Sequence, residues 1–151
     1  MLAKDVMTRE VISAGPNDRI EDVAKILIDN KISGLPVVDG QGHLLGIVTE
    51  KDLIIKAADL KVPFYITLFD SIIYLQNTIR FNEQLKKYTA TLVKEAMSKK
   101  VVAVEEDTPV SKIVEMMQGE EINRVPVVRH GKLVGIITRN DILKALVKSN
   151  G

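Results

Sequence analysis

Two Thr-x-x-Asp motifs carry the clearest candidate chemistry in the sequence. Thr49 and Asp52 form one motif, and Thr138 and Asp141 form the other. Each stands where an apolar run typical of a buried strand gives way to a helical pattern, a junction at which backbone N–H groups and the helix dipole favour an anion. A threonine hydroxyl can donate to a phosphate there, and a carboxylate can accept both hydroxyls of a ribose. The same spacing also fits a structural capping box, with Thr as the N-cap and Asp three residues on, so the residues alone leave both interpretations open.

Reaction chemistry of other kinds is not visible. The chain has no Cys and two His, which excludes disulfides, thiolate zinc sites, iron–sulfur clusters and a thiol nucleophile. His43 and His130 fall in matching turns without clustered carboxylates, so we expect no metal site. Walker-loop, serine-hydrolase and metalloprotease motifs are lacking. We therefore predict a protein that is not an enzyme and has no catalytic cofactor.

Composition and charge narrow the class of protein further. A hydrophobic fraction of 46% with 27% charged residues predicts a packed domain. The 21 basic and 20 acidic residues leave no block basic enough for a nucleic-acid footprint, so nucleic acid is not an expected partner. The start of the chain lacks a signal-peptide pattern, and no apolar stretch approaches the roughly 20 residues of a bilayer span. We expect a cytoplasmic protein without a membrane span.

The sequence contains an internal repeat that places the two motifs in equivalent positions. Residues 32–38 (ISGLPVV) return as 122–128 (INRVPVV), an offset of 90. Residues 46–53 (GIVTEKDL) return as 135–142 (GIITRNDI), an offset of 89. Each copy predicts the same series: a short strand, a helix with an apolar stripe, a hairpin of two buried strands and a closing helix. The order is therefore β-α-β-β-α, twice, with the first short strands expected at 11–13 and 101–104.

Three repeated motifs resemble those of the CBS domain family: Met-Thr at 7–8 (Met-Ser at 97–98), the Pro-Val-Val strand, and the Gly-Ile-[Val/Ile]-Thr-x-x-Asp ending. The resemblance covers about residues 1–57 and 91–149. It implies an α+β (mixed α/β) fold in which two β-α-β-β-α repeats pack about a pseudo-twofold axis, an arrangement called a Bateman module. We predict CBS repeat 1 at 1–57, a helical insert rich in aromatics at 58–92, and CBS repeat 2 at 93–151.

The segment between the copies holds every aromatic residue of the chain, from Phe64 to Tyr88. Residues 64–69 alone are rich in strand formers, whereas the longer spacing through Leu75 favours a helix. We predict two helices with a break near 76–78. The insert is expected to fold onto the module as a lid or hairpin, to present a partner surface, or both.

The resemblance also implies where a ligand binds, because in this family the Asp typically binds a ribose and the Thr or Ser a phosphate. Each ligand is expected in a cleft between the copies, with its adenine between small or aliphatic side chains. One predicted site contains Thr138, Arg139, Asn140, Asp141, Ile12, Ser13, Ile32 and Ser33. The other contains Thr49, Lys51, Asp52, Val102, Ala103, Ile122, Asn123 and Arg124.

Basic residues beside the motifs are candidate phosphate partners, namely Lys51, Arg124 and Arg139. Arg124 is the strongest candidate, because its counterpart in the first copy is Gly34. The two sites are then unequal, and the site with Arg124 is expected to prefer the more charged ligand.

Together, these features and the resemblance predict a regulatory module that binds an adenine nucleotide (AMP, ADP or ATP) between its repeats and signals to a partner protein. The effector would be a separate, unknown chain, and the family resemblance implies a homodimer. Two alternatives stay open: a sensor of S-adenosylmethionine or another adenosyl compound, and a protein-interaction scaffold that needs no ligand.

Overall fold

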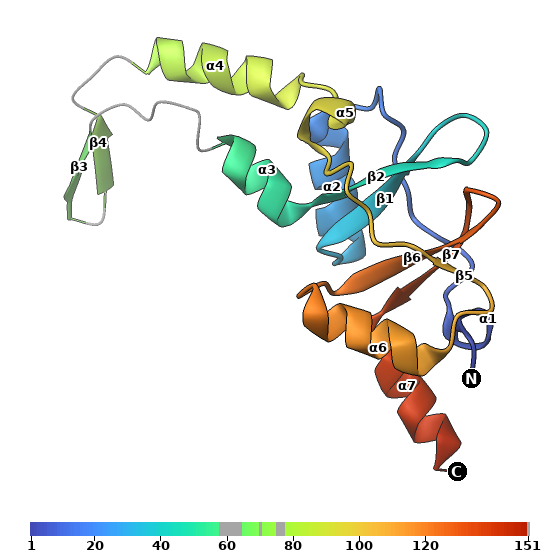
Figure 1. The fold of residues 1–151 in the computed structure, drawn as a ribbon. Coiled ribbons are helices and arrows are strands. Elements are labelled where there is room, and N and C mark those ends of the chain that lie inside the picture. Colours follow the sequence, from blue (N-terminus) through green and yellow to red (C-terminus); the bar gives the residue numbers. More distant parts are fainter. Residues whose placement is uncertain (58–64, 70, 75–77, 151) are drawn as a thin grey trace.

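The computed structural model describes residues 1–57, 65–69, 71–74 and 78–150. These residues form two similar halves with a projecting arm between them in sequence (Figure 1). The first half contains α2 (Ile20–Asn30), β1 (Gly34–Val38), β2 (Leu44–Thr49) and α3 (Glu50–Ala57). The second half contains β5 (Val104–Glu105), α6 (Val110–Gly119), β6 (Arg124–Arg129), β7 (Lys132–Thr138) and α7 (Arg139–Ser149). Two short helices, α1 (Ala3–Val6) and α5 (Val93–Ala96), precede the halves.

The two sheets confirm the predicted α+β class and differ in one strand. β1 and β2 pair antiparallel, as do β6 and β7, and β5 adds a parallel strand to the second sheet. In the first half a single parallel bridge between Ala14 and Val37 takes the place of β5. The strand predicted at 11–13 is therefore wrong, and the one predicted at 101–104 is reduced to β5. Val11 and Ile12 line a cleft instead of extending the first sheet.

Each half has its own hydrophobic core, built as the helical stripes predict. In the first half, α2 buries Val23 and Leu27 against strand residues such as Val37. In the second half, α6 buries Ile113 and Met117 in the same way. Spacings of three and four residues place these side chains on one helix face, and covering that face is what holds each helix on its sheet.

The two halves exchange their first short helices, which ties them together. Ala3 and Met7 lie in the core of the second half, whereas Val93 lies in the core of the first. Thr8 exchanges two backbone hydrogen bonds with Ile136, each of 2.9 Å. Residues 91–98 make the equivalent contacts with the first half, so the pattern is that of a pseudo-twofold axis. The boundaries predicted for the three segments stay a prediction.

Glycine makes this exchange possible at the equivalent points in β2 and β7. A Cβ on Gly46 would lie 2.6 Å from the backbone oxygen of Ser98, and a Cβ on Gly135 would press into the side chain of Met7. The repeated Met therefore needs a facing residue without a side chain. This contact gives a physical reason for the spacing between the repeated Met and the repeated Gly-Ile motif.

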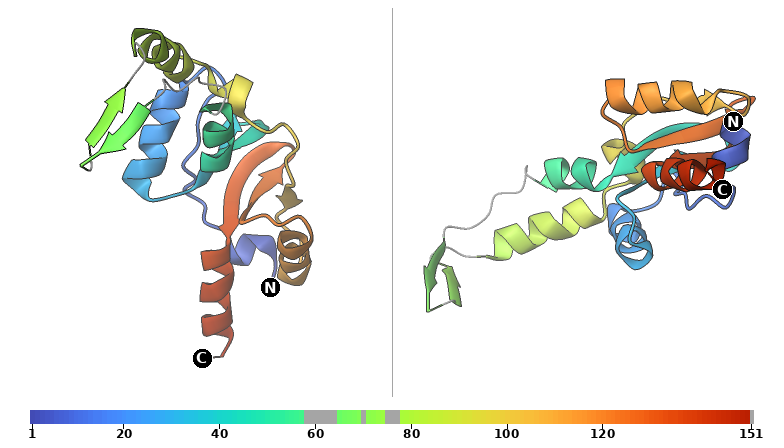
Figure 2. Two further views of the ribbon diagram at one scale, coloured as in Figure 1. Left: turned by 90° about the vertical axis from the view of Figure 1, so that its left-hand side faces the viewer. Right: turned by 90° about the horizontal axis from the view of Figure 1, so that it is seen from below.

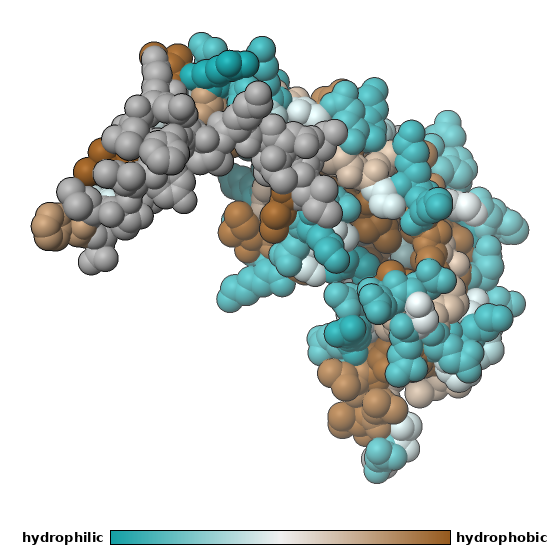
Figure 3. Space-filling view, turned by 60° about the vertical axis from the view of Figure 1, so that its left-hand side comes forward, coloured by the Kyte–Doolittle hydropathy of each residue, from teal (hydrophilic) through white to brown (hydrophobic). Residues whose placement is uncertain are grey.

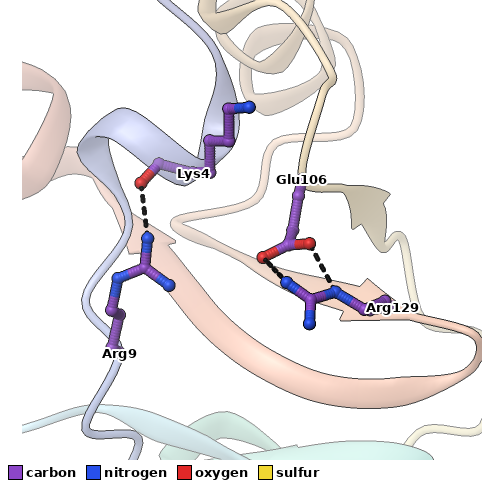
Figure 4. Close-up of polar contacts among 4 residues, drawn as sticks. All are labelled: Lys4, Arg9, Glu106 and Arg129. Carbon is purple, nitrogen blue, oxygen red and sulfur yellow. Dashed lines mark hydrogen bonds and ion pairs between the residues drawn. The ribbon is translucent and has the colours of Figure 1, made fainter.

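Polar contacts lie at the edge of the second half, where the N-terminal segment passes Glu106, and Figure 4 shows those made by the side chains of Arg9 and Arg129. The backbone N–H of Lys4 donates to the carbonyl of Glu106 at 3.0 Å, and Arg9 donates to the carbonyl of Lys4 at 3.3 Å. Arg129 binds the Glu106 carboxylate through two hydrogen bonds of 2.7 and 2.8 Å. The Arg129 hydrogen bond lowers the pKa of Glu106 below its usual value.

The arm consists of β3 (Tyr65–Leu68), β4 (Ser71–Tyr74) and α4 (Ile79–Thr89). It projects from the side of the first half (Figures 1 and 2). β3 and β4 form an antiparallel hairpin, so the first of the two predicted helices is wrong. The local run of β-branched and aromatic residues favours strands more than the longer spacing favours a helix. The second predicted helix is confirmed by α4; residues 58–64 and 75–77, including most of the predicted break, lie outside the described residues.

Candidate functional site

The two Thr-x-x-Asp motifs lie where β2 passes into α3 and where β7 passes into α7. At the second junction the Asp141 carboxylate accepts from the Thr138 backbone N–H at 2.8 Å and from its hydroxyl at 2.9 Å. Asp52 accepts from the N–H and hydroxyl of Thr49 at 2.9 and 3.0 Å. The capping-box interpretation is therefore confirmed for Thr138, the N-cap of α7. Capping uses only one oxygen of each carboxylate, so a second role remains open to the other oxygen.

The second carboxylate oxygens have different surroundings. Thr8 donates its hydroxyl to Oδ1 of Asp141 at 3.1 Å, and Asp141 is only 9% exposed. Ser98, the repeat counterpart of Thr8, lines the cleft beside Asp52. Within the described ranges, no side chain hydrogen-bonds Oδ1 of Asp52. Asp52 thus keeps one carboxylate oxygen without a side-chain donor among the described residues, whereas both oxygens of Asp141 already accept a hydrogen bond.

Asp141 lies in a cleft of about 430 Å³ that both copies line. Of the residues predicted for this cleft, the second copy contributes four and the first copy three: Thr138, Arg139, Asn140, Asp141, Ile12, Ile32 and Ser33. Asn123 and Arg124, predicted for the other cleft, line this one as well. Ser13 is not among the lining residues. Sequence reasoning missed Thr8, Glu10, Val11, Lys31, Gly34, Ile136 and Lys144. The sequence did contain a signal for Thr8, which follows the repeated Met. Its repeat counterpart, Ser98, lines the other cleft.

Asp52 lies in an equivalent cleft of about 370 Å³. The structure brings together the predicted residues Thr49, Lys51, Asp52, Val102, Ile122, Asn123 and Arg124. Ala103 does not line this cleft. Ser33, predicted for the other cleft, lines this one too, and the residues missed from the sequence are Ile47, Glu50, Ser98, Lys100, Val101 and Glu121. No described residue of the arm lines either cleft.

Arg124 lies between the two copies. Its guanidinium donates a hydrogen bond to the hydroxyl of Ser33 and lies where a side chain on Gly34 would otherwise stand. Burial lowers the pKa of Arg124 from its usual value, while Glu50 and Asp52 act in the opposite direction. The side chain is half-buried, and its charge faces acidic groups at the rim of the Asp52 cleft.

A protein-family model described as the CBS domain matches residues 3–59 and 93–148. These two segments make up more than half of the chain. The chain belongs to the CBS domain family. The predicted resemblance is thereby confirmed, and the two halves described above are its two CBS repeats.

Three known proteins place this CBS pair among its relatives. An uncharacterised protein of Methanocaldococcus jannaschii is 34% identical over 157 residues, covering 97% of this chain and 92% of that protein. The structure of CBSX2 in complex with AMP has a TM-score of 0.76 over 99% of this chain and 98% of that one; at 23% identity it shows the fold alone. The CBS domain pair of protein MJ0100, in complex with 5-methylthioadenosine and S-adenosyl-L-methionine, has a TM-score of 0.68 and 29% identity, covering 99% of this chain and 98% of that one.

Two findings describe the chain outside its clefts. The helices in the described ranges are too short or too polar to cross a membrane. The described residues also hold no cluster of three or more His, Cys, Asp or Glu side chains suited to a metal ion.

Proposed function

We propose that this CBS pair is a regulatory module that binds an adenine nucleotide in the clefts between its repeats and signals the bound state to a partner protein. The observation that carries the proposal is the make-up of each cleft. A Thr-x-x-Asp junction from one copy faces aliphatic side chains and strand backbone from the other copy. A ligand in either cleft therefore touches both repeats, and it can favour one relative arrangement of them by its differential affinity.

The lining suits the two parts of adenosine. Asp52 offers a free carboxylate oxygen to ribose hydroxyls, and Asp141 can do so when its bond to Thr8 opens. Aliphatic side chains, such as Ile12 and Ile32 in one cleft and Val102 and Ile122 in the other, offer apolar surface to an adenine ring. Among the described residues the lining includes no aromatic side chain, so the adenine would be held by aliphatic contacts.

The cations at the clefts support a phosphorylated ligand. Arg124 lines both clefts, while Arg139 and Lys51 each line one. The helix N-termini at Thr49 and Thr138 add backbone N–H groups that favour an anion. Within the proposal, these groups select AMP, ADP or ATP over uncharged adenosine.

The MJ0100 pair supports a second candidate from the same chemical class. That protein was solved with two adenosyl compounds that contain no phosphate. Such a ligand would make the same ribose and adenine contacts in these clefts, but it has no phosphate for the cationic side chains to bind. The alternative is therefore a sensor of S-adenosylmethionine or a related adenosyl ligand.

A thermal-shift comparison separates these candidates. AMP, ADP, ATP, S-adenosylmethionine and a single-stranded RNA would each be added to the full chain. A ligand at 100 times its Kd stabilises the folded state by about 2.7 kcal/mol, an increase of several degrees in Tm for a chain of this size. A larger shift with nucleotides than with S-adenosylmethionine at matched concentrations supports the proposal. No shift with any adenosyl compound contradicts it and favours a ligand-independent scaffold.

Exposed apolar side chains support the partner part of the proposal. Ile28 on α2 is 75% exposed and Val147 on α7 is 76% exposed. Apolar surface gathers at the lower end of the molecule over α7 (Figure 3), where Leu143 and Leu146 are also exposed. On the arm, Phe69 at the hairpin turn is 94% exposed. We assign the helical surfaces to a second copy of the chain and the arm to the effector, which a pull-down with and without ATP would test.

A further inference from the structure

The side chain of Arg124 spans the distance between the two Thr-x-x-Asp junctions. Its backbone lies opposite Thr138 in the β6–β7 ladder. Its guanidinium reaches the other copy, where Nη1 lies 2.7 Å from the position that a Cβ on Gly34 would take. Gly34 in turn lies opposite Thr49 in the β1–β2 ladder. One residue therefore starts beside one junction and ends beside the other.

The pseudo-twofold symmetry is broken at this residue. The repeat counterpart of Arg124 is Gly34, and the missing side chain of Gly34 is what leaves room for the guanidinium. Other cations at the clefts are exposed, and each lines only one of the two. Those at the Asp141 cleft are Lys31, Arg139 and Lys144, and those at the Asp52 cleft are Lys51 and Lys100.

We propose that the two clefts share Arg124 as their principal hydrogen-bond donor to a phosphate. An anionic ligand in one cleft would then weaken the binding of an anionic ligand in the other. The inference rests on the proposed function. A half-buried guanidinium binds a phosphate through strong, directional hydrogen bonds that exposed, hydrated lysines do not match. A second phosphate meets a guanidinium already engaged and the negative charge of the first ligand.

The wild-type protein tests the proposal by isothermal titration with AMP and with adenosine. Adenosine lacks the phosphate, so it should occupy the two clefts with little interaction between them. AMP should bind one cleft tightly and the other about tenfold more weakly or worse, the size expected for a charge-assisted hydrogen bond. Two AMP molecules that bind with no such difference would overturn the proposal.

Single-cleft variants show whether Arg124 serves both sites. Asp52→Asn is designed to disable the Asp52 cleft so that only the Asp141 cleft binds, and Asp141→Asn does the reverse. Each substitution replaces the carboxylate by a neutral side chain of the same shape. Adding Arg124→Gln should lower AMP affinity about tenfold or more in both backgrounds and leave adenosine affinity unchanged. A loss confined to one background shows that Arg124 belongs to one cleft, and it contradicts sharing.

A matched control comes from Arg139, which lines only the Asp141 cleft. Arg139→Gln should lower AMP affinity in the Asp52→Asn background alone. Binding of neither adenosine nor AMP to the wild-type protein would refute the proposed function itself. If adenosine binds in both clefts and the two AMP affinities differ no more than the two adenosine affinities, only the sharing of Arg124 is refuted.

Discussion

At the end of β7, the Asp141 carboxylate caps α7 with one oxygen and accepts from Thr8 with the other. At the end of β2, Asp52 caps α3 in the same way, yet within the described residues its other oxygen has no side-chain partner. The backbone around the two is equivalent, because Thr8 pairs with Ile136 as Ser98 pairs with Ile47. The side chains at 8 and 98 differ by one methyl group, which restricts the rotamers of Thr but not of Ser. Asp141 is thus linked to the other copy through Thr8, whereas Asp52 has no such link among the described residues, and the methyl group at position 8 is the side-chain difference that we expect to account for this.

Removing each carboxylate in turn should show the largest difference between the two junctions. Asp141→Ala removes the cap and leaves the Thr8 hydroxyl without its partner, and we expect a loss of about 2–4 kcal/mol in the free energy of unfolding. Asp52→Ala removes only the cap and should cost about 1 kcal/mol. Urea denaturation of both variants measures the difference. Equal losses would show that the bond from Thr8 contributes nothing.

The paired glycines give the next largest effect. A Cβ on Gly46 would meet the backbone oxygen of Ser98 at 2.6 Å as well as the side chain of Met97, whereas the three atoms nearest to a Cβ on Gly135 all belong to the side chain of Met7. Backbone cannot move aside as a methionine side chain can, so Gly46→Ala should cost about 2–3 kcal/mol and Gly135→Ala about 1 kcal/mol. Denaturant midpoints of the two variants test this order. The reverse order would contradict the view that the side chain of Met7 yields more readily than the backbone of Ser98.

Much of the fold could be predicted because the chain repeats itself. The offset of 90 fixes which segments are equivalent, and the apolar stripes fix which faces of the two helices are buried. Both Thr-x-x-Asp motifs and the asymmetry between Arg124 and Gly34 are visible in the sequence. These features depend on residues close in sequence or on a regular spacing, so they can be recognised without knowing how distant segments pack.

What could not be predicted depends on contacts between distant residues. The exchange of α1 and α5 brings Thr8 to Asp141 across 133 positions, and no local pattern encodes that pairing. The reach of Arg124 into both clefts depends on how the copies pack. The prediction of a helix in the first part of the arm failed for a different reason. The spacing of its apolar residues fits a helix, whereas its β-branched and aromatic residues favour strands, and at 65–74 the strand preference prevails.

Exchanging the side chains at 8 and 98 sharpens the comparison further. Ser98→Thr should give Asp52 the partner that Asp141 already has, raising the free energy of unfolding by about 0.5–1 kcal/mol. It should also weaken AMP binding in the Asp141→Asn background, where only the Asp52 cleft remains. Thr8→Ser should shift the Asp141 cleft in the opposite direction. Unchanged stability and unchanged affinity in both variants would show that the methyl group does not direct the hydroxyl.

The smallest effect is expected at the surface pair of Arg129 and Glu106, which has no counterpart in the first copy, where Asp39 and Pro16 occupy the repeat positions. The Arg129 hydrogen bond lowers the pKa of Glu106. The stability from this pair is therefore present above the ordinary carboxyl pKa of about 4.3 and is lost as the pH falls through the lowered value. The difference in unfolding free energy between wild type and Glu106→Gln should be constant from pH 7 to about pH 5 and shrink toward pH 3. Added salt should also shrink it, because the pair is exposed.

Asp39 provides the matched control from the first copy. Its pKa is lowered chiefly by the backbone N–H groups of His43 and Gln41, and to a smaller extent by the His43 imidazole, whose Nδ1 lies 3.3 Å from Oδ2 of Asp39. The pH-dependent difference between wild type and Asp39→Asn should therefore have the same sign as that of Glu106→Gln but respond much less to salt. Unfolding measured at low and high ionic strength separates the two. Equal salt sensitivity would mean that the contact between Glu106 and Arg129 is not the source of the lowered Glu106 pKa in solution.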